Sequence, residues 1–251
     1  QITGVNAIYF YAPTIFEQSG IGQNAAFSQA IWVGLVNVIF TIVSMMLIDK
    51  LGRRPLMLIG LSGVAISMCI AAYGFSQATY TLTDASLEKL DNTSLQVSLK
   101  PMANQTFHSD VEFKDSIIAL IGEQQAQQHQ ARLIQAAATM NPTIILVGIL
   151  GFVASFAVSL GPVMWVLLAE IFPNHLRGVG IALTGLINSA VSFTVQQFFP
   201  LQLAILGTAT TFLIYGAFAL LGFALLYKLL PETKGLKLEQ LGKVFDKQKN
   251  S

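Results

Sequence analysis

Charged residues are scarce in this chain, and their scarcity excludes a water-soluble globular domain. Asp, Glu, Lys and Arg make up 11% of the 251 residues, whereas hydrophobic residues make up 53%. Soluble domains average about 25% charged residues, so this chain lacks the polar side chains that would cover a surface facing water. The sequence therefore predicts an integral membrane protein.

Cysteines, metal-ligand patterns and catalytic motifs are also rare or absent. The single cysteine, Cys69, cannot form a disulfide within the chain, and its place in an apolar run predicts a small buried side chain. The histidines lack the spacing of zinc ligands, and no Gly-x-Ser-x-Gly motif or phosphate-binding glycine loop occurs. The net charge of +1 gives no basis for nucleic acid as a partner. We expect no enzyme activity, no metal and no cofactor.

Long uncharged runs dominate what is present. They cover residues 27–48, 56–83, 133–169 and 178–227, and about 20 apolar residues cross the ~30 Å hydrocarbon layer as a helix. The last run is long enough for two spans, which we expect to be divided at Pro200. The sequence thus predicts an all-α membrane protein with six transmembrane helices, at residues 1–19, 27–48, 56–76, 142–170, 178–199 and 204–228.

The lysines and arginines test this assignment, because basic residues beside membrane spans stay cytoplasmic. Ten of the 14 lie in three connections on one side, namely residues 49–55, residues 172–178 and the tail that begins at Lys228. We therefore predict that the C-terminal tail (229–251) is cytoplasmic and that the protein is multi-pass in the plasma or inner membrane. The long segment 77–141 would then be an extracytoplasmic insertion.

This insertion is too polar to cross a bilayer. Apolar residues recur at helical spacing in residues 115–138, which predicts a short surface helix. Asn92 and Asn104 each begin an Asn-x-Ser/Thr triplet, a pattern that accepts glycans in secreted segments and that also occurs by chance. The sequence leaves glycosylation open and indicates no mechanistic role for the insertion.

A few polar side chains fall inside the predicted spans, where they must face a partner or a wet cavity. They are Gln1, Asn6, Asn37, Asn188, Gln196, Gln197 and Glu170. Amides both donate and accept hydrogen bonds, which suits a neutral, hydroxyl-rich ligand such as a sugar. The alternative is that each amide only bonds a neighbouring helix.

Aromatic residues and a helix break accompany these amides. Tyr9, Phe10, Tyr11 and Trp165 could stack on the faces of sugar rings, or they could simply pack against lipid. Gly161-Pro162 predicts a break in the helix just before Trp165. Broken membrane helices line cavities or serve as hinges, although a purely structural kink stays possible.

Charges gather at the cytoplasmic ends of the predicted spans. Glu170, Asp49, Arg53, Arg54 and Arg177 could form an ion network that is intact when that side is closed and breaks when it opens. The alternative is a set of solvated charges, each contributing about 0–1 kcal/mol.

Four stretches carry a family resemblance. "QITGVNAIYFYAP" (1–13), "DKLGRRPL" (49–56), "GPVMWVLLAEIFPNHLRG" (161–178) and "PETKGLKLEQL" (231–241) follow one another in the chain. In order and spacing they resemble motifs of the sugar porters of the major facilitator superfamily, apart from the enlarged segment 77–141. Bacterial pentose/proton symporters and glucose facilitators are similar.

The resemblance implies that the chain is the C-terminal half of a twelve-helix transporter. Residues 1–76 would hold helices seven to nine and residues 142–228 helices ten to twelve. An N-terminal six-helix half, absent from this chain, would be the partner. By position, the resemblance assigns sugar contacts to Gln1, Asn6, Asn37, Trp165 and Asn188. We also assign Phe10 and Tyr11 to the sugar site, where relatives have two tyrosines. This difference, together with Ser189 where many relatives have tryptophan, leaves the identity of the sugar open.

The implied function is alternating-access transport of a monosaccharide, a hexose or a pentose. Gly161-Pro162 would let the tenth helix close over the sugar, and Asp49, Arg53, Arg54, Glu170 and Arg177 would form the cytoplasmic latch. Transport of an inositol-like polyol or a disaccharide stays open, as does a sugar receptor that does not transport. Proton symport and uniport also stay open, since the coupling carboxylate of symporters in this family lies on the first helix.

Overall fold

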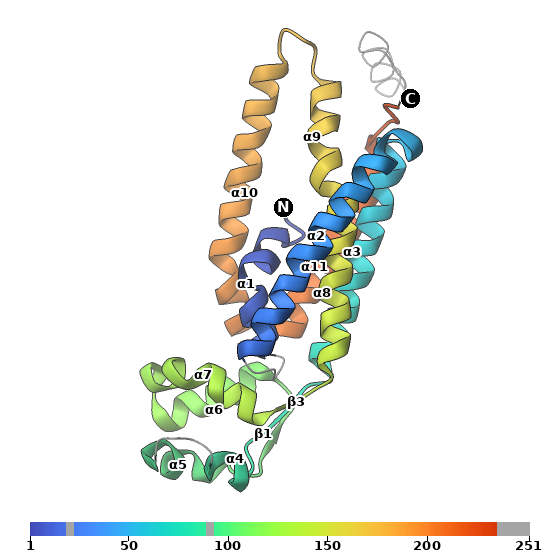
Figure 1. The fold of residues 1–251 in the computed structure, drawn as a ribbon. Coiled ribbons are helices and arrows are strands. Elements are labelled where there is room, and N and C mark those ends of the chain that lie inside the picture. The colour runs from blue at the N-terminus through green and yellow to red at the C-terminus, as the bar shows by residue number, and fades with distance from the viewer. Residues whose placement is uncertain (19–22, 89–92, 235–251) are drawn as a thin grey trace.

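The computed structural model describes residues 1–18, 23–88 and 93–234. Long helices run side by side in a bundle, and a small domain sits at one end of it (Figure 1). The bundle helices are α1 (Val5–Gln18), α2 (Gln23–Leu51), α3 (Arg53–Ser76), α8 (Pro142–Val158), α9 (Leu160–Ile171), α10 (Arg177–Ile205) and α11 (Thr208–Leu229). The helical membrane fold predicted from the sequence is therefore confirmed.

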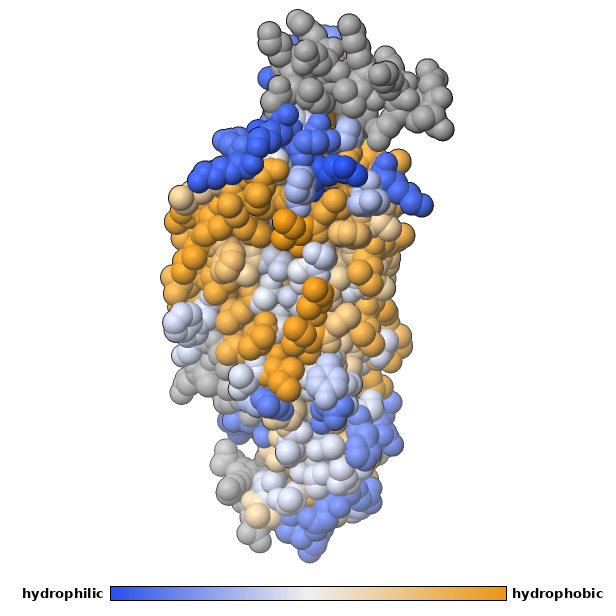
Figure 2. All heavy atoms as spheres, turned by 90° about the vertical axis from the view of Figure 1, so that its right-hand side faces the viewer, coloured by the Kyte–Doolittle hydropathy of each residue, from blue (hydrophilic) through white to orange (hydrophobic). Residues whose placement is uncertain are grey.

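Five stretches of the bundle are long and apolar enough to cross a membrane. They are Ile31–Leu51, Arg53–Ser76, Pro142–Ile171, Arg177–Ile205 and Thr208–Leu229. The predicted first span forms the shorter helix α1, which has 14 residues. Figure 2 shows the consequence on one face, where a broad apolar band lies between hydrophilic ends.

Small residues let α3 and α8 approach closely along their lengths. A Cβ added to Gly60 would lie 1.5 Å from Ser159 Oγ, and one added to Gly148 would lie 2.7 Å from the backbone nitrogen of Ala71. Membrane helices lack a hydrophobic force between them and rely on such close packing. The fully buried Phe152 and Phe212 belong to the bundle core beside this contact.

Two predicted breaks lie elsewhere than expected. Pro200 does not divide the last run, because α10 continues through it to Ile205; a membrane helix tolerates the one backbone donor that proline removes. The chain turns at Gly207 instead, whose φ of +78° suits glycine. The break between α8 and α9 lies at Ser159, and Gly161-Pro162 forms the first turn of α9, where the missing N–H of Pro162 would have no helical acceptor anyway.

The insertion between α3 and α8 folds into a domain with its own core. Its helices are α4 (Asp84–Glu88), α5 (Thr93–Leu99), η1 (Lys100–Met102), α6 (Asp110–Ile121) and α7 (Glu123–Ala137). A small antiparallel sheet, in the order β2-β1-β3, joins β1 (Thr79–Thr81), β2 (Thr106–Phe107) and β3 (Ala138–Thr139). Tyr80, Leu133 and Phe113 are among the buried residues.

This domain corrects two expectations. The single helix predicted for 115–138 is two helices, α6 and α7, because Gly122 with φ +78° separates them. The insertion also contains strands, which an all-α assignment omits. Asn104 is exposed with φ +60°, and its side chain donates to Asp84. Asn92 lies outside the described residues.

Cys69 corrects a third expectation. Its side chain is exposed on α3 and not buried. The apolar run around it predicted burial, but a membrane helix is apolar on its outer face as well.

Candidate functional site

A cavity of about 490 Å³ opens in the middle of the bundle, and we call it the central cavity. Its wall combines residues from α1, α2, α9, α10 and α11. Five of the predicted sugar-contacting residues line it, namely Gln1, Asn6, Asn37, Trp165 and Asn188. The structure therefore brings these residues together around one hollow.

Hydrogen bonds orient several of these amides. Asn6 Nδ2 donates to Gln1 Oε1 at 2.9 Å and also to Ser192 Oγ on α10. Gln196 Nε2 donates to the same Ser192 hydroxyl at 2.9 Å. Asn6 thus bridges two helices, which is the structural role that the sequence left as an alternative, and it lines the cavity at the same time.

Other amide groups keep their bonding capacity. Tyr9 Oη donates to Asn37 Oδ1 at 3.0 Å, which holds the Asn37 side chain in place. Within the described residues, the NH2 group of Asn37 and the whole amide of Asn188 have no side-chain partner. These groups can donate to and accept from a ligand in the cavity.

The aromatic residues are arranged differently from the sequence-based assignment. Tyr9 lines the central cavity, whereas Phe10 does not and is 69% exposed. Tyr11 packs against Phe199, with ring centroids 5.1 Å apart. Tyr9 was among the aromatic candidates but not among the assigned contacts, and its spacing from Asn6 did not distinguish it from Phe10, since residues three and four apart share a helix face.

A second hollow, the amide cavity, adjoins the first and measures about 460 Å³. Asn6 and Asn188 line both cavities. The wall of the amide cavity further includes Tyr11, Ser192, Gln196 and Gln197. The amides of Gln196 and Gln197 therefore line the hollow next to the central cavity.

Apolar side chains complete the central cavity. Trp165 lies on α9 and is 46% exposed, and Phe156, Leu160 and Met57 line the same cavity. The break at Ser159 ends α8 and lets α9 start in a new direction, which carries Gly161 and Trp165 to the wall. Such a wall, apolar with a few polar groups, is typical of small-molecule sites.

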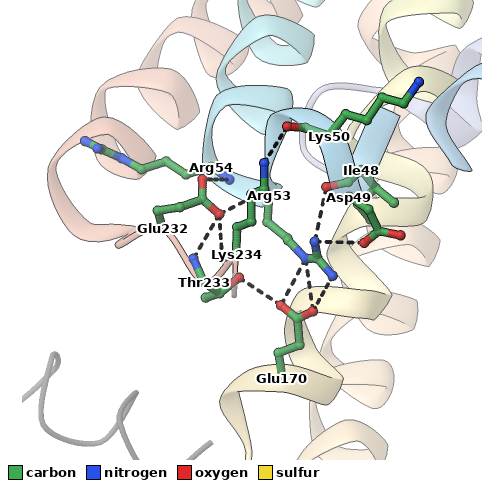
Figure 3. Close-up of polar contacts among 9 residues, drawn as sticks. All are labelled: Ile48, Asp49, Lys50, Arg53, Arg54, Glu170, Glu232, Thr233 and Lys234. Atoms are coloured by element: carbon green, nitrogen blue, oxygen red, sulfur yellow. Dashed lines mark hydrogen bonds and ion pairs between the residues drawn. The ribbon is translucent and has the colours of Figure 1, made fainter. Parts of the chain in front are cut away.

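At the end of the bundle opposite the insertion, Arg53 anchors a group of charges that we call the ion cluster (Figure 3). Its Nη2 lies 2.7 Å from Glu170 Oε1, and its Nε contacts both Glu170 oxygens at 3.0 and 3.2 Å. Its Nη1 lies 3.1 Å from Asp49 Oδ1. The side chain of Arg53 is 13% exposed and that of Glu170 is 28% exposed, so these contacts are partly shielded from water.

The segment after α11 completes the ion cluster. Thr233 Oγ1 donates to Glu170 Oε2 at 2.8 Å. The Glu232 carboxylate accepts from the backbone N–H groups of Arg53 and Arg54 at 3.0 and 3.2 Å, and so caps α3. Gly52 makes room, because a Cβ there would lie 2.7 Å from Glu232. The sequence reasoning missed both residues, although they lie in the quoted "PETKG" motif.

The remaining predicted members take other positions. Arg54 donates from Nη2 to the backbone oxygen of Tyr227 at 2.8 Å, and its guanidinium lies 5.4 Å from the Tyr227 ring centroid. Arg177 forms no ion pair with any residue that the structure describes, and its buried Nε has no partner there. The predicted network therefore contains Asp49, Arg53 and Glu170 as an ion-paired core, with Arg54 beside it.

Across residues 1–18, 23–88 and 93–234, no group of three or more His, Cys, Asp or Glu side chains could hold a metal ion.

Known proteins are similar to this chain in sequence and in fold. The arabinose-proton symporter of Bacillus subtilis is 31% identical over 98% of this chain and 40% of its own length. The D-xylose-proton symporter of Escherichia coli K12 is 30% identical over 96% of this chain and 38% of its own length. The chain thus spans well under half of these relatives. A solved structure of the proton:xylose symporter XylE with 6-bromo-6-deoxy-D-glucose has a TM-score of 0.66 at 28% identity, over 98% of this chain and 40% of that one.

A family model also covers most of the chain. Residues 1–92 and 119–245 match the family described as sugar (and other) transporter, and residues 93–118, inside the insertion, lie outside the match. The amide-lined cavity and the helical membrane bundle agree with that match. The chain therefore belongs to the sugar (and other) transporter family of the major facilitator superfamily.

Proposed function

We propose that this chain forms the C-terminal half of a transporter that moves a monosaccharide across the cell membrane by alternating access. The observation that carries the proposal is the central cavity, where amides and an indole from four helices meet. The similarity to arabinose and xylose symporters supports the same substrate class. The N-terminal half of those relatives would supply the other wall.

The chemistry of the cavity favours a neutral sugar. None of the side chains that line it carries a formal charge, whereas an anionic or cationic substrate would need an opposite charge in this low-dielectric position. The amides of Asn37 and Asn188 can bond hydroxyl groups in both directions. The Trp165 indole offers a flat apolar face to the C–H side of the ring.

Proton coupling is the second element of the proposal. The named relatives are proton symporters, and a symporter needs an acid that titrates within its transport route. The central cavity of this half contains no such acid. The proton-binding carboxylate would therefore come from the other half of the transporter.

The ion cluster would act as the latch of the cytoplasmic side. It joins the start of α3, the end of α9 and the segment after α11, so these elements can separate only if its bonds break. Hydrogen bonds to charged groups contribute about 1.5–3 kcal/mol each. A sugar can shift the equilibrium only by binding the two states with different affinity.

Uptake by the full-length protein in proteoliposomes tests the proposal. Trp165→Ala should reduce uptake of D-xylose, arabinose or D-glucose by raising KM, because the apolar face of the site is lost. Trp32→Ala is the matched control, since Trp32 is 55% exposed on α2 and does not line the cavity. An equal loss of uptake in both variants would contradict a sugar site in the central cavity.

The same assay separates the alternatives. Competition by inositol or a disaccharide, but not by monosaccharides, would change the substrate class. Sugar binding without any uptake would identify a receptor.

A further inference from the structure

A third hollow lies where the insertion meets the bundle, and we call it the vestibule. It measures about 460 Å³. Its wall joins Tyr11, Pro200 and Leu203 from α1 and α10 to Asp115, Gln127 and Gln130 from the helix pair α6–α7. Figure 1 shows α6 and α7 beyond the ends of α1 and α10 that face the insertion.

Shared residues connect the three hollows in series. Tyr11 lines both the vestibule and the amide cavity. Asn6 and Asn188 line both the amide cavity and the central cavity. The three hollows therefore follow one another from the insertion to the central cavity, and a ligand arriving from the insertion side would meet the vestibule first.

A buried clamp holds the wall of the vestibule in place. Asp110, at the start of α6, accepts from the backbone N–H and the hydroxyl of Thr208 at 3.3 and 2.9 Å, and so caps α11. Lys114 Nζ lies 3.1 Å from the same carboxylate, and both side chains are 12% exposed. A Cβ on Gly207 would lie 2.7 Å from Asp110 Oδ1. The helix pair is thus fixed to the bundle, so the vestibule is preformed.

The vestibule shares amide and aromatic groups with the central cavity and adds the charged side chains of Lys114, Asp115 and Glu123. Gln127 and Gln130 donate and accept, the carboxylates of Asp115 and Glu123 accept from hydroxyl groups, and Tyr11 provides an aromatic surface. The floor is apolar, formed by side chains such as Ile117 and Leu203. This mixture suits a ring with hydroxyl groups on its edge and C–H groups on its faces.

We propose that the vestibule is a second binding site for the transported sugar, occupied before the central cavity on the route from the insertion side. The proposal rests on the proposed function, because it takes the same ligand class. Asp110 and Lys114 lie within residues 93–118, outside the family match, so the clamp belongs to the part of this chain that the family model does not cover.

Sugar protection of an engineered cysteine tests the vestibule directly. The full-length protein, freed of its own cysteines, would carry Gln127→Cys together with Trp165→Ala, which weakens the central site. The probe is an equimolar mixture of D-xylose, arabinose and D-glucose, and the measured quantity is the rate of maleimide labelling. Gln128→Cys is the matched control, since Gln128 is an exposed neighbour on α7 that does not line the vestibule.

Labelling of Gln127→Cys should slow and saturate as the sugar concentration rises, about threefold when the sugar is at twice its dissociation constant, while Gln128→Cys is unaffected. Unprotected labelling would overturn the vestibule site. Protection of Gln127→Cys that occurs with native Trp165 but not with Trp165→Ala would also overturn it, because that protection would arise from sugar bound at the central site. Uptake of the same mixture by the protein with native Trp165 is measured in parallel. Normal uptake without protection of Gln127→Cys would reject the vestibule site alone. Absence of uptake would reject the proposed function.

Discussion

At the scale of single residues, the environment of each side chain decides its role more than its chemical type does. Asn6 and Asn188 are both amides in α1 and α10, yet Asn6 is bonded to Gln1 and Ser192 while Asn188 has no partner among the described residues. Asn188 is therefore the more available ligand group. Arg53 and Arg54 are neighbours in sequence, and only Arg53 pairs with Glu170.

The first prediction concerns the proposed latch. Glu170→Gln removes the charge that faces Arg53 and should shift the equilibrium toward the state open at the ion-cluster end by about 1–2 kcal/mol, or about 5- to 30-fold. Labelling of Met164→Cys, in the wall of the central cavity, by an impermeant maleimide from that side would report the shift.

Asp49→Asn is the graded control for this experiment. The Asp49 side chain is 79% exposed, and exposed ion pairs contribute little because water screens them. Its effect on Met164→Cys labelling should be much smaller than that of Glu170→Gln. Equal labelling of Glu170→Gln and the wild-type protein would contradict the latch.

At the scale of elements, close helix packing and helix capping hold the site. The contact of α3 with α8 reaches Ser159, the residue after the end of α8, where Gly60 leaves room for the serine side chain. The direction of α9, and with it Trp165, follows from this end. The predicted flexibility at Gly161-Pro162 would therefore act at the start of α9, beside a rigid α3–α8 pair.

Gly148→Ala tests the rigidity of that pair. The added Cβ would lie 2.7–2.9 Å from backbone and Cβ atoms of Ala71, which cannot rotate away. We expect a loss of about 1–3 kcal/mol of stability, as for overpacked cores, measured as thermal unfolding of the purified full-length protein in detergent. Gly34→Ala is the control, because nothing lies within 4 Å of its added Cβ and alanine favours the helix by up to about 1 kcal/mol.

The insertion makes a prediction about pH. Burial, and secondarily the negative charge of Asp110, raise the pKa of Tyr80 above its ordinary value of 10.0. The neutral phenol is therefore favoured in the folded domain. Its contribution to stability is fully present below about pH 10 and is lost as the pH rises toward the higher pKa of the folded state.

Alkaline titration followed by tyrosinate absorbance measures this effect. Tyr80 should ionise above the ordinary tyrosine range, as the insertion unfolds, and Tyr80→Phe should remove one equivalent of late-ionising tyrosine. If the absorbance that Tyr80→Phe removes instead appears near the ordinary tyrosine pKa, the burial argument is contradicted.

At the scale of the whole molecule, polarity divides the folded protein into three levels along the long axis of the bundle. The ion cluster lies at one end, the apolar band in the middle, and the insertion at the other end (Figures 1 and 2). In the proposed transporter, a sugar would pass these levels in sequence, from the vestibule through the amide cavity to the central cavity. The clamp at Asp110 and the cluster at Arg53 tie the two ends of the same bundle.

The sequence by itself determined the membrane class and the helical fold, and it named five of the polar and aromatic residues that line the central cavity. Long runs without charge lie in lipid, and amides inside such runs must face a polar partner or a wet cavity. The sequence pattern therefore predicted that Gln1, Asn6 and Asn37 face the interior of the bundle. The sequence could not separate Tyr9 from Phe10. Both lie within one helical turn of Asn6, and only the contact of Tyr9 with Asn37 on α2 decides which ring enters the cavity.

The tertiary structure also decided the contacts between distant segments. Glu232 reaches the start of α3, Asp110 reaches the start of α11, and the break before α9 falls at Ser159. Each of these features depends on which helix ends and which small residues come into contact in the folded bundle. Local patterns such as Pro200 or Gly161-Pro162 show where a helix can break, whereas packing against neighbouring helices selects where it does.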